Sequence, residues 1–392
     1  MDELHEKYAP ILRYASGERF FPMRVDDLLQ FSALYKKDQL NPLVGRGQLK
    51  PKHLARVSRS PQIFLRSVNV GPLRGSDVIK NWSAETIELI YRWSQATISQ
   101  WTEALAKKAY SWFSPKTQGA TSLFWWNELL APLLEGALES SKSGELPRFI
   151  LPAETRNDAI EKYERLTHHK KNYAYYHRTV HDGNYHCLQF WFFYSYNDWA
   201  QSFGGFNDHE GDWEGMMIFF RNDTLGRPQE PPAYITYVGH HSRITKPWHH
   251  QDVEKLGTHP VGYVAAGSHA IYPENKPYSL LALYGLVDYA TGDGLTIDHN
   301  DWIYRPALDE APWVTAFRGS WGTRYWLSLE RVQWYLRLAT IATPLSWLTA
   351  HPVNREMNLP GVSAPYGPRL GDTGLQRPQW AGPVAWAEVP QS

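Results

Sequence analysis

"GGFNDHEGDWEGMMIFF", residues 204–220, joins a dense group of acidic and imidazole side chains to a short apolar strand. The apolar end, "MMIFF", has the composition of a buried β-strand. The residues ahead of it carry five groups that water solvates well, and these are Asp208, His209, Glu210, Asp212 and Glu214. A strand that begins with so many such groups needs either water around them or a compensating positive charge among them.

Short aromatic and β-branched segments surround this stretch. From residue 172 onward they read "YAYYHRTV", "YHCLQFWFFYSY", "EGMMIFF", "AYITYVGHHS" and "PVGYVAAGSHAIYP", with Gly, Pro, Asn and Asp between them. Closely spaced strands without alternating helices favour an antiparallel sandwich over a βαβ sheet. We therefore predict a mainly β fold with an α-helical insertion, in which an antiparallel β-sandwich carries a helical hairpin.

The helical insertion is predicted between two parts of the sandwich. Ser83 is a suitable N-cap, and large apolar residues recur after it at helical spacing. These residues are Ile90, Trp93, Trp101 and Leu105. A second apolar stretch, residues 121–140, is interrupted by Pro132, which bends or breaks a helix. Together the two stretches predict a helical hairpin.

Four segments follow from these patterns. The predicted segments are an N-terminal contribution to the sandwich (1–81), the helical insertion (82–148), the sandwich core with the acidic turn (149–353) and an extended tail rich in Pro and Gly (354–392). Trp380 and Trp386 are expected to anchor the tail to the body.

The overall composition excludes several classes of protein. Lys plus Arg number 40 and Asp plus Glu number 40, so no basic excess exists to bind nucleic acid. The single cysteine, Cys187, excludes an intramolecular disulfide. The charged start "MDELHEKYAPILRY" lacks the pattern of a signal peptide, and no apolar run is long enough to span a membrane. We expect a soluble protein that is cytoplasmic or peripherally bound to a membrane.

The acidic turn itself predicts a metal site of a particular kind. Trp213 stands where a helical zinc motif needs its second histidine, so that motif is excluded. On a strand, Asp212 and Glu214 project from the same face, and a bend at Gly211 brings His209 to them. Carboxylates with one imidazole suit a hard divalent cation, which would be Mg²⁺, Ca²⁺ or Mn²⁺. Asp198, at the end of the preceding strand, is the expected fourth ligand. The alternative is an acidic turn surrounded by water.

Further polar residues are expected to line the same site. Asn197 and Asp208 flank the predicted ligands, while His241, Ser268 and His269 lie at the ends of neighbouring predicted strands. We expect these five to contact a bound ligand. His269, His241 and Glu210 are the candidates for acid or base chemistry if the protein is an enzyme.

Several of these motifs resemble the vacuolar protein sorting-associated protein 62 family. They are "YAPILRYASGERFFP", "LQFWFFYSYND", "NDHEGDWEGMMIFF", "HPVGYVAAGSHAIYP" and "PWVTAFRGSWG". The turn is also similar to that of the necrosis- and ethylene-inducing peptide toxins, in which His-x-x-Asp-x-Glu holds a divalent cation on a β-sandwich of lectin and actinoporin type. The resemblance implies the same role for His209, Asp212 and Glu214, with Asp198 as the matching upstream aspartate. The predicted helical insertion has no counterpart in the toxins.

Three functions remain open from the sequence. The first is a cation-dependent binding module for a sugar or a lipid headgroup, with peripheral membrane contact. The second is a metal-dependent hydrolase or lyase that uses cation-activated water and a histidine. The third is a scaffold in which the cation only fixes loops. No GxSxG, P-loop or dinucleotide-binding motif is found, and we take the binding module as the working hypothesis.

Overall fold

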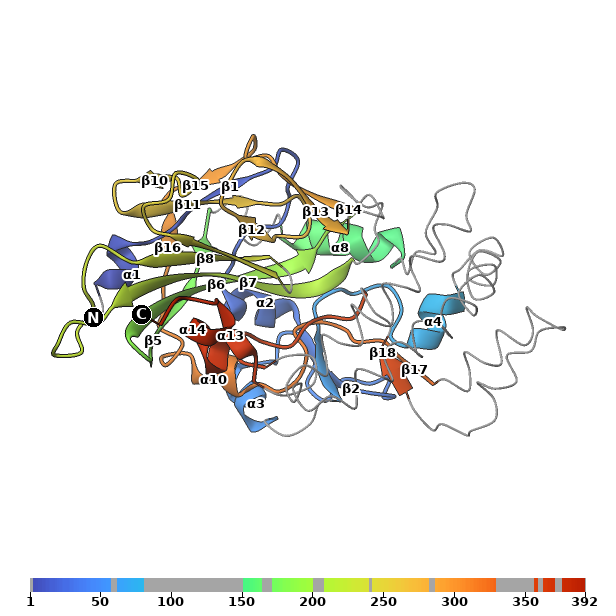
Figure 1. The fold of residues 1–392 in the computed structure, drawn as a ribbon. Coiled ribbons are helices and arrows are strands. Elements are labelled where there is room, and N and C mark those ends of the chain that lie inside the picture. The colour runs from blue at the N-terminus through green and yellow to red at the C-terminus, as the bar shows by residue number, and fades with distance from the viewer. Residues whose placement is uncertain are drawn as a thin grey trace, which may run out of the picture.

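Two β-sheets lie one above the other at the centre of the computed structural model (Figure 1). The structure describes residues 3–57, 62–80, 151–163, 171–199, 208–239, 242–281, 286–328, 356–358, 362–370 and 376–391. The predicted helical hairpin within 82–148 lies outside these residues. The prediction of a mainly β fold is confirmed.

The first sheet consists of five antiparallel strands in the order β5-β6-β7-β8-β9. The strands are β5 (Tyr176–Asp182), β6 (Tyr185–Asn197), β7 (His209–Arg221), β8 (Tyr234–Gly239) and β9 (Ser242–Pro247). β6 and β7 are each 13 residues long and pair from Tyr185 opposite Arg221 to Asn197 opposite His209. This register places the start of the acidic turn directly beside the end of β6.

The second sheet has the order β10-β11-β1-β15, with β12 paired to β11. The strands are β1 (Ile11–Tyr14), β10 (Lys255–Leu256), β11 (His259–Val264), β12 (Ile271–Tyr272) and β15 (Thr296–Ile297). β1 and β11 run parallel, with Ile11 opposite Val261. This parallel pair arises because a strand from the start of the chain inserts between two later strands.

Four two-stranded sheets complete the β structure of the described residues. They pair β2 (Ala33–Lys36) with β3 (Ile63–Arg66), β4 (Tyr173–Ala174) with β16 (Trp302–Tyr304), β13 (Lys276–Leu281) with β14 (Leu286–Ala290), and β17 (Trp326–Ser328) with β18 (Glu356–Asn358). The β3 strand leads into residues 67–72, which lie against the acidic turn.

The helices of the described residues are short. They are α1 (Leu4–Lys7), α2 (Val25–Phe31), α3 (Pro51–Arg56), α4 (Gly75–Lys80), α8 (Ala153–Tyr163), α10 (Pro312–Ala316), α13 (Pro378–Ala381) and α14 (Pro383–Trp386). None of them is long and apolar enough to cross a membrane. The tail forms the helices α13 and α14 where an extended segment was predicted.

The two faces of β6 are both covered, which explains its nearly continuous apolar sequence. On one face, Tyr194 lies against Tyr14 of the second sheet. On the other, Gln189 donates a hydrogen bond to the Gln379 carbonyl of α13, 2.9 Å away. All 13 residues of β6 are buried. A strand covered on both faces gains by burying apolar side chains in both directions, so its sequence does not alternate.

Candidate functional site

The acidic turn forms the buried beginning of β7. Asp208, His209, Glu210, Asp212 and Glu214 are between 2% and 8% exposed. An acidic turn surrounded by water, the alternative left open by the sequence, does not describe this arrangement. Each charge must instead be compensated by other groups of the protein or by a ligand.

Gly211 interrupts the regular alternation of the strand. Its φ of 65° lies in the left-handed region, which glycine adopts without steric cost. A Cβ atom added at Gly211 would lie 2.3 Å from the Trp321 carbonyl oxygen, so the position has no room for a side chain. Ahead of this bend Glu210 turns toward Ser67, whereas Asp212 beyond it turns toward His269.

Glu210 is held by two segments that are distant in sequence. One carboxylate oxygen accepts hydrogen bonds from Ser67 N, Ser67 Oγ and Val68 N, at 2.7, 2.8 and 3.0 Å. The other accepts bonds from the backbone N–H and the hydroxyl of Thr323. Burial acts to raise the pKa of Glu210, but Arg66 and these bonds outweigh it and lower the pKa. Glu210 therefore remains ionised, with both oxygens occupied by fixed donors.

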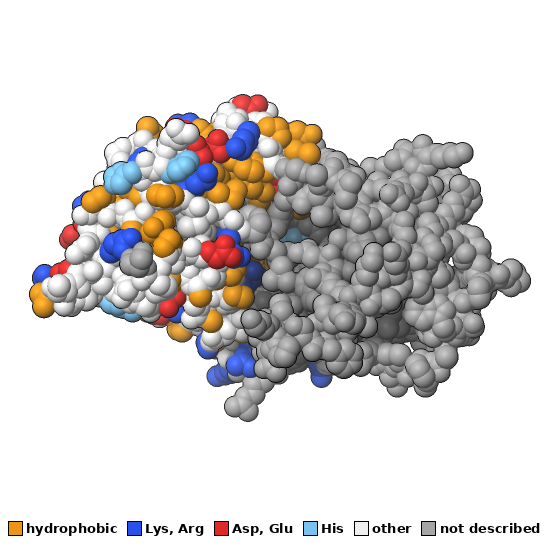
Figure 2. Space-filling model, in the orientation of Figure 1, with side chains coloured by type: hydrophobic (Ala, Val, Ile, Leu, Met, Phe, Trp, Pro, Cys, Tyr) orange, Lys and Arg blue, Asp and Glu red, His pale blue; other side chains and the backbone are white. Residues whose placement is uncertain are grey.

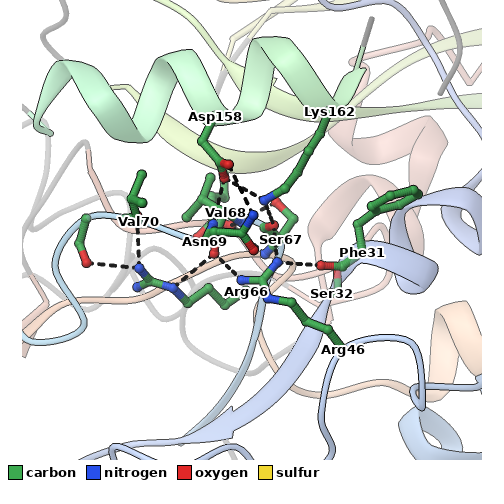
Figure 3. Close-up of polar contacts among 12 residues, drawn as sticks. Phe31, Ser32, Arg46, Arg66, Ser67, Val68, Asn69, Val70, Asp158 and Lys162 are labelled. Carbon is green, nitrogen blue, oxygen red and sulfur yellow. Dashed lines mark hydrogen bonds and ion pairs between the residues drawn. The ribbon is translucent and has the colours of Figure 1, made fainter. Parts of the chain in front are cut away.

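The loop that binds Glu210 is itself held by cationic side chains (Figure 3). Arg66 donates to the carbonyl oxygens of Val68, Val70, Gly71 and Pro72. Arg46 donates to the carbonyls of Phe31, Ser67 and Val68, and Lys162 of α8 reaches Ser67 and Asp158. These cationic side chains hold the carbonyl oxygens of the loop on the side away from Glu210, so the Ser67 and Val68 N–H groups remain directed at Glu210.

Asp198 is paired with an arginine. Arg156 of α8 donates to both oxygens of the Asp198 carboxylate, each at 2.6 Å, and Asp198 is 0% exposed. A two-point arginine–carboxylate pair is among the strongest polar contacts in proteins. The structure thus places the predicted fourth ligand in an ion pair. Asp208, just before β7, accepts a bond from Trp199 N at 2.7 Å.

Asp212 lies beside a buried histidine. Its Oδ2 atom is 3.2 Å from His269 Nδ1, and the other ring nitrogen of His269 is 3.6 Å from Glu18 Oε1. The His269 ring stacks on Tyr194, with centroids 3.9 Å apart and planes 2° apart. His269 has a φ of 59°, a left-handed conformation that is uncommon outside glycine. The surrounding contacts thus hold the imidazole between two carboxylates.

This position controls the charge of His269. Burial alone would lower its pKa, but the charge of Glu18 and the contacts with Asp212 and Glu18 raise the pKa to about 9. The imidazole is therefore protonated at neutral pH. For Glu18, burial acts to raise the pKa, whereas His269 and the backbone N–H groups of Phe20 and Gly267 lower it. The positive charge that the acidic turn requires is supplied in part by His269.

Glu214 is compensated less well than its neighbours. None of the residues that the structure describes forms a hydrogen bond with its carboxylate. Burial and the charge of Asp212 raise the pKa of Glu214 well above its ordinary range, although the charge of Arg377 opposes this. An approaching cation would reverse this effect, because it favours the ionised carboxylate.

His209 presents a nitrogen suited to metal binding. Its Nδ1 atom is 2.9 Å from the Gly211 carbonyl oxygen, which identifies Nδ1 as the protonated nitrogen. Nε2 then carries the lone pair. Burial lowers the pKa of His209 although the Asp212 charge opposes this, so the ring is neutral at neutral pH. Histidines that bind metals commonly donate their second ring nitrogen to a carbonyl in this way.

Asn197 adds an oxygen to the same group. Its amide nitrogen donates to Asp212 Oδ2 at 3.0 Å and to the Ser268 carbonyl at 3.4 Å. Its Oδ1 atom is buried and accepts no hydrogen bond within the described part of the chain. Beside it, the Ser268 hydroxyl donates to Asp288 at 2.8 Å. A buried carbonyl oxygen without a donor costs free energy unless a ligand satisfies it.

The structure therefore separates the residues predicted for the site. Asn197, Asp212, Ser268 and His269 are in contact with one another, while Glu210 and Asp198 are bound to Ser67, Thr323 and Arg156. His241 lies outside the described residues. Within the described ranges, no three His, Cys, Asp or Glu side chains are arranged so as to hold a metal ion directly. Both oxygens of Asp212 are occupied instead, by Asn197, the Trp213 N–H and His269.

Some partners in this site escaped the sequence analysis. Glu18, Arg156 and Asp288 were not predicted, although "ASGERFFP" places two charged residues, Glu18 and Arg19, between small and apolar ones. A buried acid in such a segment is a signal of a buried partner. Arg156 lies in an amphipathic helix where a charge is ordinary, so no local pattern distinguishes it.

Comparison with known proteins gives one weak likeness. No family model matches this chain, and no curated protein matches it. A crystal structure of Necrosis and Ethylene inducing Protein 2, from the causal agent of cocoa's Witches Broom disease, matches with a TM-score of 0.25 and 11% identity. The match covers 36% of this chain and 57% of that one. The resemblance to the vacuolar protein sorting-associated protein 62 family receives no support from these comparisons.

Proposed function

We propose that this protein is a divalent-cation-dependent binding protein that recognises a sugar or a lipid headgroup. The cation would be held by His209, Asp212 and Glu214, with the amide oxygen of Asn197 as a further ligand in place of Asp198. One observation carries the proposal: Glu214 is a buried carboxylate with no hydrogen bond from the described residues, and it lies two positions from a second buried carboxylate.

The chemistry of the donor groups supports a hard cation. Two carboxylates, an amide oxygen and one neutral imidazole match the preferences of Ca²⁺, Mg²⁺ or Mn²⁺ better than those of structural zinc. Two observations support the last two of these donors: Nδ1 of His209 faces the Gly211 carbonyl, which leaves Nε2 with its lone pair, and Oδ1 of Asn197 accepts no hydrogen bond from the described residues. The His269 contact with Asp212 opposes the cation, since the imidazolium competes for the same carboxylate.

The function of the cation would be to bind hydroxyl or phosphate oxygens of a headgroup. Ions of this kind retain waters that ligand oxygens can replace. No observation favours the alternative function, a metal-dependent hydrolase or lyase. Its candidate acid or base residues are not accessible, because Glu210 is fully hydrogen-bonded and His269 is 0% exposed.

A binding screen tests this function. The protein is applied to glycan and lipid arrays with Ca²⁺, Mg²⁺ or Mn²⁺, and again with chelator. We expect binding that requires the cation and is lost in Glu214→Gln. Glu274→Gln, which changes a half-buried carboxylate paired with Lys276, should bind as the wild type does. Binding that chelator leaves unchanged, or that Glu214→Gln retains, contradicts the proposal.

A further inference from the structure

The segment 36–56 combines exposed leucines with a concentration of positive charge. Leu40 is 61% exposed and Leu43 is 47% exposed. The segment contains six Lys or Arg residues and a single acidic residue, Asp38, so its formal charge is +5. The whole chain is balanced, with 40 basic and 40 acidic residues. This local excess is therefore a feature of the segment and not of the composition.

Backbone hydrogen bonds anchor the end of the segment that carries Leu43. Leu43 N and Val44 N both donate to the Leu34 carbonyl, and Leu34 N donates to the Val44 carbonyl at 2.9 Å. Val44 packs against the core, whereas its neighbour Leu43 is 47% exposed. Arg46 ties the same segment to the Phe31 carbonyl at 2.6 Å. The loop thus presents its leucines from an anchored backbone.

Four basic side chains of the same segment are also exposed. Lys36, Lys50, Lys52 and Arg56 are all exposed. Lys36 ends β2, and Lys52 and Arg56 belong to α3; both elements lie at the lower edge of the molecule in Figure 1. Figure 2 shows Lys and Arg side chains along that edge. We call Lys36, Leu40, Leu43, Lys50, Lys52 and Arg56 the leucine–lysine surface.

We propose that the leucine–lysine surface docks onto a membrane that carries anionic lipids. Exposed leucines gain free energy when they leave water for the acyl boundary, and lysines are attracted to the negative surface of such a membrane. Nucleic acid would use the lysines but not the leucines. The alternative occupant, an acidic protein, is an outcome of the test below. This docking does not involve the buried acidic turn, so it needs no divalent cation.

Vesicle sedimentation of the full chain tests the docking. We expect the protein to sediment with vesicles of phosphatidylserine and phosphatidylcholine in the presence of chelator, and not with phosphatidylcholine alone. Leu40→Glu with Leu43→Glu is expected to lower the partition coefficient by at least about tenfold. Lys36→Glu with Lys52→Glu is expected to lower it similarly, and added salt should weaken wild-type binding.

Two matched controls keep the test specific. Leu225→Glu changes a leucine that is 73% exposed in the connection between β7 and β8, and Lys171→Glu changes an exposed lysine ahead of β4. Both should bind vesicles as the wild type does, and near-ultraviolet circular dichroism should show that every variant is folded. The proposal is overturned if the wild type does not sediment, if the controls lose as much binding as the double variants, or if the double variants bind normally. Binding to poly-glutamate without binding to vesicles would also overturn it, in favour of an acidic protein partner.

The two proposals fail in distinguishable ways. If chelator abolishes vesicle binding and the leucine variants bind as the wild type does, the docking proposal is contradicted and the cation-site proposal is not. If sedimentation persists in chelator and the leucine variants abolish it, the docking proposal is supported, whatever the arrays show for the cation site.

Discussion

His269 lies between two buried carboxylates and carries a positive charge that both of them need. It contacts Asp212 at 3.2 Å and Glu18 at 3.6 Å, and all three side chains are buried. At the scale of single residues, each acidic group near the turn has its own partner: Arg156 for Asp198, and backbone and hydroxyl donors for Glu210. Glu214 is the exception, and it is the residue on which the proposed cation site depends.

The charge of His269 predicts a pH dependence of stability. Its pKa is raised to about 9 from the ordinary 6.5. Protonation of His269 therefore stabilises the folded state fully below pH 6.5, and this contribution disappears as the pH rises through 9. His269→Asn, which tolerates the left-handed backbone, should lower the free energy of unfolding by about 3 kcal/mol at pH 6 and by less above pH 9. Denaturant titrations at several pH values measure this, and a pH-independent difference would contradict it.

At the scale of elements, Glu210 links the start of β7 to the loop after β3 and to Thr323. Its carboxylate accepts five hydrogen bonds from Ser67, Val68 and Thr323. These bonds hold the strand on one side of the Gly211 bend, while Asp212 is held on the other. The geometry of the proposed site therefore depends on residues that do not touch it.

Glu210→Gln tests this link. The amide keeps the shape of the carboxylate but replaces one acceptor with a donor that faces other donors. We expect the free energy of unfolding to fall by about 1–3 kcal/mol, the cost of unsatisfied buried groups. Glu274→Gln, which removes a surface ion pair with Lys276, should change stability by less than about 1 kcal/mol. Equal effects of the two substitutions in chemical denaturation would show that the link is unimportant.

The C-terminal helices provide a second prediction at this scale. Trp380 of α13 lies under the Arg178 guanidinium, 3.8 Å from the ring centroid, and near Trp191 of β6. Trp380→Ala should destabilise the protein by about 1–3 kcal/mol, since it removes a partly buried ring that packs against the core. A thermal melt checks this, and an unchanged midpoint would mean that the tail contributes little to the fold.

Sequence patterns predicted the elements better than their partners. The aromatic runs of β6 and β7 indicated strands, because local composition suits a covered sheet. The parallel pairing of β1 with β11 could not be predicted, since "ILRY" contains no information about a partner some 250 residues away. The Arg156–Asp198 pair could not be predicted for the same reason, since its two residues are far apart in the sequence. Strand periodicity predicted a shared face for Asp212 and Glu214, but the identity of the compensating charges depends on tertiary contacts.

At the scale of the whole molecule, cation binding should appear as stability. A ligand that binds only the folded state adds about 2.7 kcal/mol at a hundredfold excess over Kd. We expect saturating Ca²⁺, Mg²⁺ or Mn²⁺ to raise the melting temperature of the wild type by several degrees relative to chelator. In chelator, Glu214→Gln should be as stable as the wild type or more so, because it removes repulsion with Asp212. A variant that is destabilised in chelator would indicate that Glu214 has a different partner.

The most direct test of the cation site is a calorimetric titration of the chelator-treated protein with Ca²⁺, Mg²⁺ and Mn²⁺. We expect the wild type to bind one ion per chain in a saturable way. The affinity should be at least about tenfold lower in Glu214→Gln and in Asn197→Leu. Asp198→Asn should bind with an affinity close to that of the wild type. Absence of binding by the folded wild type, or binding that Asp198→Asn abolishes and Glu214→Gln retains, would contradict the proposed cation site.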